Sequence, residues 1–264
     1  VQFTKQIGDS HSLDWALGQT ALLAPNSVSR ARQAFTAARA LNDHDSGAVA
    51  WLGKIDLAVG NLADANLQLR RAAELDPANE VTWLYAGSAA FQADHQAEAI
   101  RLWKQIPHSG FALTLIGDRL AGQNRWNIAV SLYQTALESS PAYPKAYVGL
   151  ADCLVALGRP SEAIAAYQAA LNLGLRSAVV ANRLGKVLAS QGRTQEAVPY
   201  LERAVEWHPY PWFVADLAYA YAGLGQIDKA DRCIGKIEQI APTSGAAYFL
   251  VGEYYLNVRS MPLV

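Results

Sequence analysis

The feature that most constrains this chain is an internal repeat with a period close to 34 residues. Seven alanines share one local pattern, with spacings of 34, 34, 30, 34, 34 and 33 residues: Ala31, Ala65, Ala99, Ala129, Ala163, Ala197 and Ala230. A bulky apolar residue stands four positions after each alanine, and Ala or Ile stands seven positions after it. Positions i, i+4 and i+7 lie on one face of an α-helix, so each repeat is predicted to contain a helix with a packed face.

A tight turn and another helix are predicted before each of these alanines. Five residues before the alanine the chain has Gly, Asn or Asp, which tolerate a left-handed backbone: Asn26, Gly60, Asp94, Asn124, Gly158, Gly192 and Gly225. Twelve residues before it stand Gln19, Gly53, Gly87, Gly117, Ala151, Gly185 and Ala218, six of which are small. We therefore expect helix, turn and helix in each repeat, with small residues where the helices cross and a large one that wedges into the next repeat.

These features resemble the tetratricopeptide repeat family over nearly the whole chain. The segments AVAWLGKIDLAVGNLADANLQLRRAAELDP and AYVGLADCLVALGRPSEAIAAYQAAL carry the resemblance most clearly. It implies an all-α fold, a right-handed α-solenoid superhelix of stacked helix-turn-helix repeats. It also implies one superhelical domain over residues 1–264, with repeats at about 12–45, 46–79, 80–109, 110–143, 144–177, 178–210 and 211–244 and a partial one at 245–264.

Three positions depart from the repeat pattern. The third repeat is about four residues short around Pro107 and His108. Asp56 stands where neighbouring repeats carry Leu or Tyr, so its carboxylate is expected either to have a partner or to rotate outward. Pro199 falls within the second helix of the sixth repeat, where it removes one backbone hydrogen bond and is expected to bend the helix.

Composition excludes several classes of protein. Hydrophobic residues make up 52% of the chain, too many for a disordered protein. The net charge is −1, so we expect no nucleic-acid partner, because nothing attracts phosphates over a distance. No apolar run approaches the roughly 18 residues that span a bilayer. Because the chain begins at Val1 rather than Met, we interpret it as a processed product or a fragment, and membrane association through a partner or a missing anchor stays open.

The sequence contains no recognisable catalytic or metal-binding constellation. Its five histidines lie apart from one another and from Cys153 and Cys233, which are expected to be buried as small apolar residues. Glycine-rich phosphate loops and the G-x-S-x-G motif are absent from the sequence. Carboxylates such as Glu98, Glu162 and Glu196 recur at helix starts, where the helix dipole favours them. We therefore expect no catalytic residue, no metal and no cofactor.

The resemblance implies that the first helix of each repeat lines a concave groove that binds peptides or partner helices. Two rows can be followed from repeat to repeat on these helices, one largely apolar and one with mixed charge. The residues predicted to form the partner-binding groove are Lys54, Leu84, Ser88, Phe111, Asp118, Val148, Asp152, Asn182, Lys186, Tyr219 and Phe249.

Two acidic residues in consecutive repeats suggest the charge of the partner. Asp118 and Asp152 predict a locally acidic stretch at the middle of the groove. A segment with apolar anchors and a central basic residue would suit such a surface. The alternative is that both rows are ordinary solvated helix faces.

Two further surfaces are rich in aromatic residues. The segment WHPYPWF predicts a docking patch for a partner or a membrane interface, formed by Trp207, Tyr210, Trp212 and Phe213, with packing between repeats as the alternative. The last helix is apolar on more than one side around Phe249 and residues 254–256, although terminal repeats usually have a polar outer face. We expect that the chain continues beyond this helix or that another subunit covers it.

The leading functional prediction is a protein–protein interaction scaffold within a larger assembly, binding a peptide, a helix or a subunit surface. The alternative is a soluble recognition domain of a membrane-anchored enzyme, such as a glycosyltransferase or ligase. An independent hydrolase or transferase is a third reading.

Overall fold

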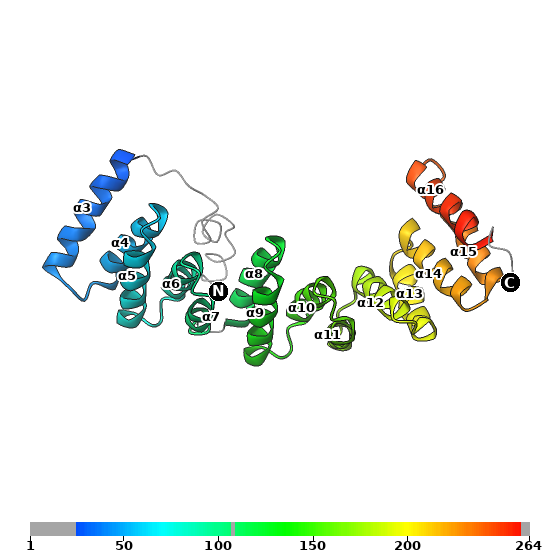
Figure 1. The fold of residues 1–264 in the computed structure, drawn as a ribbon, viewed down its shortest axis with the longest axis horizontal. Helices are drawn as coiled ribbons and strands as arrows, with labels where there is room; N and C mark the ends of the chain where they lie inside the picture. The colour runs from blue at the N-terminus through cyan, green and yellow to red at the C-terminus, as the bar shows by residue number, and fades with distance from the viewer. Residues whose placement is uncertain (1–24, 107–108, 260–264) are drawn as a thin grey trace. The chain divides into compact units, whose positions relative to one another are not determined.

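The computed structural model describes residues 25–106 and 109–259, and these residues form helices and turns without any β-strand. The chain divides into two compact units, residues 1–141 and 142–264, which we call unit 1 and unit 2. The all-α stack of helical hairpins expected from the repeat is confirmed in both units (Figure 1). The single domain over residues 1–264 stays a prediction.

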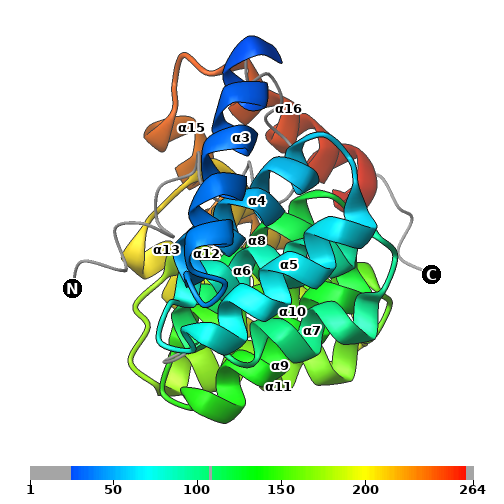
Figure 2. The same ribbon diagram turned by 90° about the vertical axis from the view of Figure 1, so that its left-hand side faces the viewer.

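Unit 1 consists of helical hairpins that pack side by side. Helix α4 packs against α5, α6 against α7 and α8 against α9, and α5 also packs against α6. An additional helix, α3, lies against α4 (Figure 2). The first helix of the first predicted repeat lies outside the described residues. The helices of unit 1 are α3 (Pro25–Leu41), α4 (Ser46–Ala58), α5 (Leu62–Leu75), α6 (Glu80–Gln92), α7 (Gln96–Trp103), α8 (Ser109–Gly122) and α9 (Trp126–Ser139).

Unit 2 repeats the same arrangement. Helix α10 packs against α11, α12 against α13 and α14 against α15, while α16 packs against both α14 and α15. A short π-helix, η1, continues directly from α16. The helices of unit 2 are α10 (Pro144–Ala156), α11 (Pro160–Asn172), α12 (Ala178–Ser190), α13 (Thr194–Trp207), α14 (Pro211–Gly223), α15 (Ile227–Ile240), α16 (Gly245–Tyr254) and η1 (Tyr255–Arg259).

The turn within each hairpin has the backbone conformation that the sequence predicts. Positive φ angles occur at six of the seven expected positions: Gly60, Asp94, Asn124, Gly158, Gly192 and Gly225. The exception is Asn26, which lies in the first turn of α3. The two non-glycine positions, Asp94 and Asn124, have φ angles of 63° and 61°. Asp and Asn adopt this region more readily than other side chains, so they can replace glycine there.

The two helices of a hairpin approach closely where a small residue faces a bulky one. A Cβ atom added to Gly87 would lie 2.3 Å from Nε1 of Trp103, a fully buried side chain. The same conflict would arise at Gly53 with Leu69, at Gly117 with Tyr133 and at Gly185 with Leu201. Each bulky residue thus packs onto the first helix of its own repeat. The expectation that it wedges into the next repeat is incomplete, because it left out this contact.

The structure also accounts for two departures from the repeat pattern. Asp56 is 1% exposed and accepts hydrogen bonds from Arg32 Nη2 and Gln68 Nε2, each at 2.6 Å, so of the two alternatives it is partnered. Pro199 lies inside α13, as predicted. Cys153 and Cys233 are free and buried, which confirms their expected apolar role. Pro107 and His108 lie outside the described residues.

The close crossing predicts a difference between two glycines of unit 2. Gly185→Ala should lower the unfolding free energy by about 1–3 kcal/mol, because the new methyl group overlaps Leu201 Cγ at 2.5 Å. Gly235→Ala, within α15, should be neutral or stabilising by up to about 1 kcal/mol, because a Cβ there meets no atom within 4 Å among the described residues. Equilibrium urea unfolding followed by circular dichroism measures both, and equal effects would contradict the crossing geometry.

Candidate partner-binding groove

Unit 2 contains a groove with a volume of about 700 Å³. It is lined by the first helix of each repeat in the unit, α10, α12, α14 and α16, together with one side chain from α11. The lining residues are Asp152, Val155, Tyr167, Val179, Asn182, Arg183, Lys186, Val187, Tyr210, Trp212, Phe213, Ala215, Asp216, Tyr219, Leu250 and Glu253. Volumes of this size are typical of sites that enclose several side chains of a ligand.

One face of α12 supplies the most exposed part of this lining. Val179, Arg183 and Lys186 are spaced four and three residues apart, so they follow one stripe along the helix. All three side chains are exposed and line the groove. The stripe begins with an apolar residue and ends with two cations, and a bound segment would meet these two kinds of contact in order.

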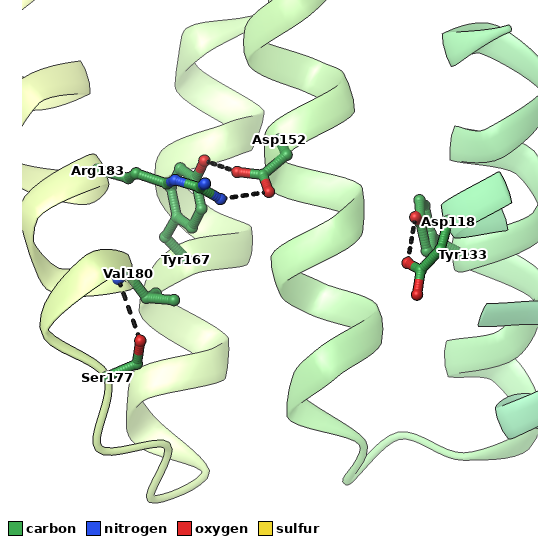
Figure 3. A network of polar contacts seen from close by, with 7 residues as sticks. All are labelled: Asp118, Tyr133, Asp152, Tyr167, Ser177, Val180 and Arg183. Atoms are coloured by element: carbon green, nitrogen blue, oxygen red, sulfur yellow. Dashed lines mark hydrogen bonds and ion pairs between the residues drawn. The ribbon is translucent and has the colours of Figure 1, made fainter. Parts of the chain in front are cut away.

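The carboxylate of Asp152 is held by two donors from within unit 2. The buried Tyr167 donates its hydroxyl proton to Asp152 Oδ1, and Arg183 Nη1 donates to Asp152 Oδ2 at 2.5 Å (Figure 3). Burial and the neighbouring carboxylate both raise the pKa of Tyr167 above its ordinary value, so the hydroxyl stays protonated and continues to donate. Asp152 therefore enters the groove already partnered.

Unit 1 contains the same tyrosine–carboxylate pair one repeat earlier. Tyr133 donates to Asp118 Oδ1 at 2.7 Å, and the two residues are 15 positions apart, as are Tyr167 and Asp152 (Figure 3). The pair joins the first helix of a repeat to its second helix. Both aspartates predicted to attract a basic partner thus already accept hydrogen bonds within their own repeats.

A second carboxylate of the groove links two consecutive repeats. Asp216 on α14 accepts a hydrogen bond from Asn182 Nδ2 at 2.9 Å, and its other oxygen lies 3.4 Å from Lys186 Nζ. Asn182 is 5% exposed, so its amide mainly joins α12 to α14. The Lys186 side chain is 59% exposed and keeps hydrogen-bond donors directed to solvent.

The aromatic segment between α13 and α14 divides into a buried part and an exposed part. Phe213 is buried in a cluster with alanines of α12 and α13, and Trp207 packs against that cluster. Tyr210 and Trp212 are exposed at the groove, with ring planes stacked at a centroid distance of 4.7 Å. Of the four predicted docking residues, three line the groove: Tyr210, Trp212 and Phe213.

The predicted groove residues of unit 1 occupy different environments. Leu84 and Ser88 are fully buried, and the Ser88 hydroxyl donates to the Leu84 carbonyl oxygen at 2.8 Å. Phe111 is exposed on α8. Lys54 Nζ lies 4.7 Å from the ring centroid of Trp51 and 4.5 Å from that of Tyr85.

Burial affects the titration of this aromatic–lysine cluster. It lowers the pKa of Lys54 and raises the pKa of Tyr85 to about 12. The attraction between the ammonium group and the two rings compensates in part for the lost hydration.

In unit 2, the predicted residues Asp152, Asn182, Lys186 and Tyr219 come together in the groove, while Val148 is half-buried and outside its lining. Phe249 lies on a different face of α16 from the lining residues Leu250 and Glu253. Sequence reasoning missed Arg183 and Asp216. The available signal for Asp216 was its position 34 residues after Asn182, one repeat period.

The described residues show neither a metal centre nor a membrane span. In residues 25–106 and 109–259, no group of three or more His, Cys, Asp or Glu side chains is arranged to hold a metal ion. Within the same residues, no helix is both long enough and apolar enough to cross a membrane.

The stacked hairpins and the groove on their first helices define a helical-repeat protein. Models of the tetratricopeptide repeat match residues 114–178 and 188–251. The chain belongs to the tetratricopeptide repeat family, whose fold is in general a scaffold for protein–protein interaction.

Named relatives share this repeat. Tetratricopeptide repeat protein 21B of Mus musculus is 28% identical over 105 residues, 40% of this chain and 8% of the relative. The Homo sapiens protein of the same name is 30% identical over 93 residues, 35% of this chain and 7% of the relative. The chain thus spans less than a tenth of the length of these relatives.

A solved structure shows the same fold. The structure of pilF from Pseudomonas aeruginosa has a TM-score of 0.50 and 17% sequence identity, and the match covers 87% of this chain and 99% of that one. At this level of identity, the similarity concerns the fold alone.

The geometry around Asp152 predicts unequal effects on stability. Asp152→Ala should lower the unfolding free energy by about 1–3 kcal/mol, because the buried Tyr167 hydroxyl loses its acceptor. Arg183→Met should cost less than about 1 kcal/mol, because both partners of this ion pair are partly exposed. Urea unfolding of the two variants tests the ranking, and a larger loss for Arg183→Met would show that the ion pair has the structural role.

Proposed function

We propose that this chain is a non-catalytic protein-interaction scaffold and that the groove of unit 2 binds a segment of a partner protein. The observation that carries the proposal is the α12 stripe, where an exposed apolar residue and two exposed cations line one continuous groove. A polypeptide segment offers apolar side chains and hydrogen-bond acceptors at similar intervals, so it is complementary to this stripe.

The exposed aromatic wall would supply the apolar part of the binding energy. Tyr210 and Trp212 are large, stacked rings that present apolar area while already ordered by their contact with each other. Rigid aromatic side chains lose little conformational entropy on binding, and Trp and Tyr are the residues most often found at energetic hot spots. Val179 extends this apolar surface along α12.

The cations would supply the polar part. Asp152 is occupied by Tyr167 and Arg183, so the basic residue expected from the sequence would have to compete with bonds that already exist. Arg183 carries five N–H donors and Lys186 three, and most of them extend beyond their printed carboxylate contacts. We therefore assign an acidic side chain to the partner segment, next to its apolar anchor.

No catalytic, metal or cofactor role is assigned to any residue in this proposal. The carboxylates of the groove are engaged in bonds that join helices, which is a structural use of these groups. The alternative of a recognition domain within a membrane-anchored enzyme receives no support from the groove or from the named relatives.

Selection from a random peptide library displayed on phage, with the purified chain as bait, tests this proposal. Enriched peptides should pair an aromatic or aliphatic residue with a nearby Asp or Glu. For a selected peptide, Trp212→Ala should weaken binding by about tenfold or more, as expected for a hot-spot aromatic residue. Lys186→Glu should weaken it by a similar factor, and an Asp-to-Lys change in the peptide should restore part of the loss.

The matched control is Lys236→Glu, which reverses an exposed charge on α15 outside the groove lining and should leave peptide affinity unchanged. Peptides that bind equally well to the Trp212 and Lys186 variants would show that this groove is not the binding site. Enrichment of basic peptides would instead return the assignment to the acidic groove expected from the sequence.

A further inference from the structure

The outer face of α16 and the start of η1 is an apolar surface that no described helix covers. Tyr248, Phe249, Tyr255 and Leu256 are 49%, 65%, 48% and 71% exposed. The opposite face of α16 is fixed by Ala247, Val251 and Tyr254, which are buried. Neither charged nor strongly polar side chains belong to the exposed stripe, whereas a helix face in water normally carries them.

Gly252 lies at the centre of this stripe and is the counterpart of the small crossing residues in the earlier repeats. It follows Ala218 by 34 residues, one repeat period. In four earlier repeats, the glycine at this position touches a bulky side chain of the next helix. At Gly252, an added Cβ would meet no atom within 4 Å among the described residues. The surface therefore has a site for close helix approach without a helix in it.

The apolar residues are distributed symmetrically about Gly252. Tyr248 and Phe249 lie four and three positions before it, and Tyr255 and Leu256 lie three and four positions after it. Tyr255 keeps helical dihedral angles, φ −63° and ψ −36°, so the stripe continues unbroken past the end of α16. Reversing the direction of the helix exchanges the two apolar pairs and leaves Gly252 in place.

We propose that this face is a homodimer interface, in which α16 of one copy packs antiparallel to α16 of a second copy, with Gly252 at the crossing point. A two-fold axis through Gly252 brings Tyr248 and Phe249 of one copy against Tyr255 and Leu256 of the other, twice. Such a contact is isologous, because the same patch serves both copies and closes the assembly at two. The small residue at the centre allows the backbones to approach closely.

Charge and composition agree with this occupant. The chain carries a formal net charge of −1, so two copies repel each other only weakly. Interface cores are depleted of charged residues and enriched in aromatic ones, as this stripe is. The groove of unit 2 uses Leu250 and Glu253 of α16, so the dimer contact and the groove occupy different faces of this helix.

Sedimentation equilibrium of the chain, from about 1 to about 100 µM, tests the proposal and should show a monomer–dimer equilibrium. Phe249→Ser should raise the dimer dissociation constant by about 100-fold, because each dimer loses two buried rings. Trp212→Ser, an exposed aromatic residue in the groove, is the matched control and should leave dimerisation unchanged. Circular dichroism verifies that both variants keep their helices.

Cysteine cross-linking tests the position of the axis. Gly252→Cys should form an intermolecular disulfide under mild oxidation, because two residues at the crossing point lie within the usual Cα separation of about 4.4–6.8 Å. Gly245→Cys on the same helix should not, because it lies about 10 Å along the axis from the crossing point in each copy. The chain without added cysteine sets the baseline, since Cys153 and Cys233 are buried.

Three results would overturn the proposal: a monomer at every concentration, a dimer that Phe249→Ser does not weaken, or equal cross-linking at positions 252 and 245. A monomer whose α16 face is covered by a helix of another protein belongs to the first of these. Peptide binding in the groove is measured separately, so the fate of one proposal does not decide the other.

Discussion

The structure depends on one recurrent contact, the packing of a bulky side chain of a second helix onto a small residue of the first. Trp103 on Gly87 and Leu201 on Gly185 are instances in which a single added methyl group would overlap the neighbouring helix. This contact fixes how closely the two helices of a hairpin lie. Because a hairpin cannot bury its apolar face alone, the stack grows by repeating the same contact, and the first helices are left side by side with one face available to other molecules.

Most of the fold could be predicted because it rests on local rules that recur at a fixed period. Left-handed turn positions such as Gly60 and Asn124 depend only on which residues tolerate positive φ. The small–large pairs are visible as two columns in the aligned repeats. The direction of the wedge was predicted incompletely, since a column of bulky residues does not say which of two adjacent helices it touches. That answer depends on helix crossing geometry, which periodicity alone does not contain.

The candidate site was less predictable because it is built from contacts between repeats of unequal length. The seventh repeat has a 33-residue spacing, and carrying the register across it selects the buried Ala215 instead of the neighbouring Asp216, the residue that bonds Asn182. Ion pairs are harder still, since Arg183 reaches Asp152 in the preceding repeat over 31 residues. A sequence shows that both charges exist, but not that they neutralise each other. The acidic groove expected from two aspartates therefore became a groove in which the cations have donors to spare.

Helix α16 shows how one element can serve three purposes through its three faces. Ala247, Val251 and Tyr254 attach it to the stack, Leu250 and Glu253 complete the groove, and the stripe around Gly252 faces outward. If two copies pair through that stripe, each dimer presents two grooves on a closed, two-fold assembly. A partner with two copies of its binding segment then gains effective concentration from the second contact, without any change in the groove itself. A scaffold of low intrinsic affinity can thereby retain a repetitive or dimeric partner and release a monomeric one.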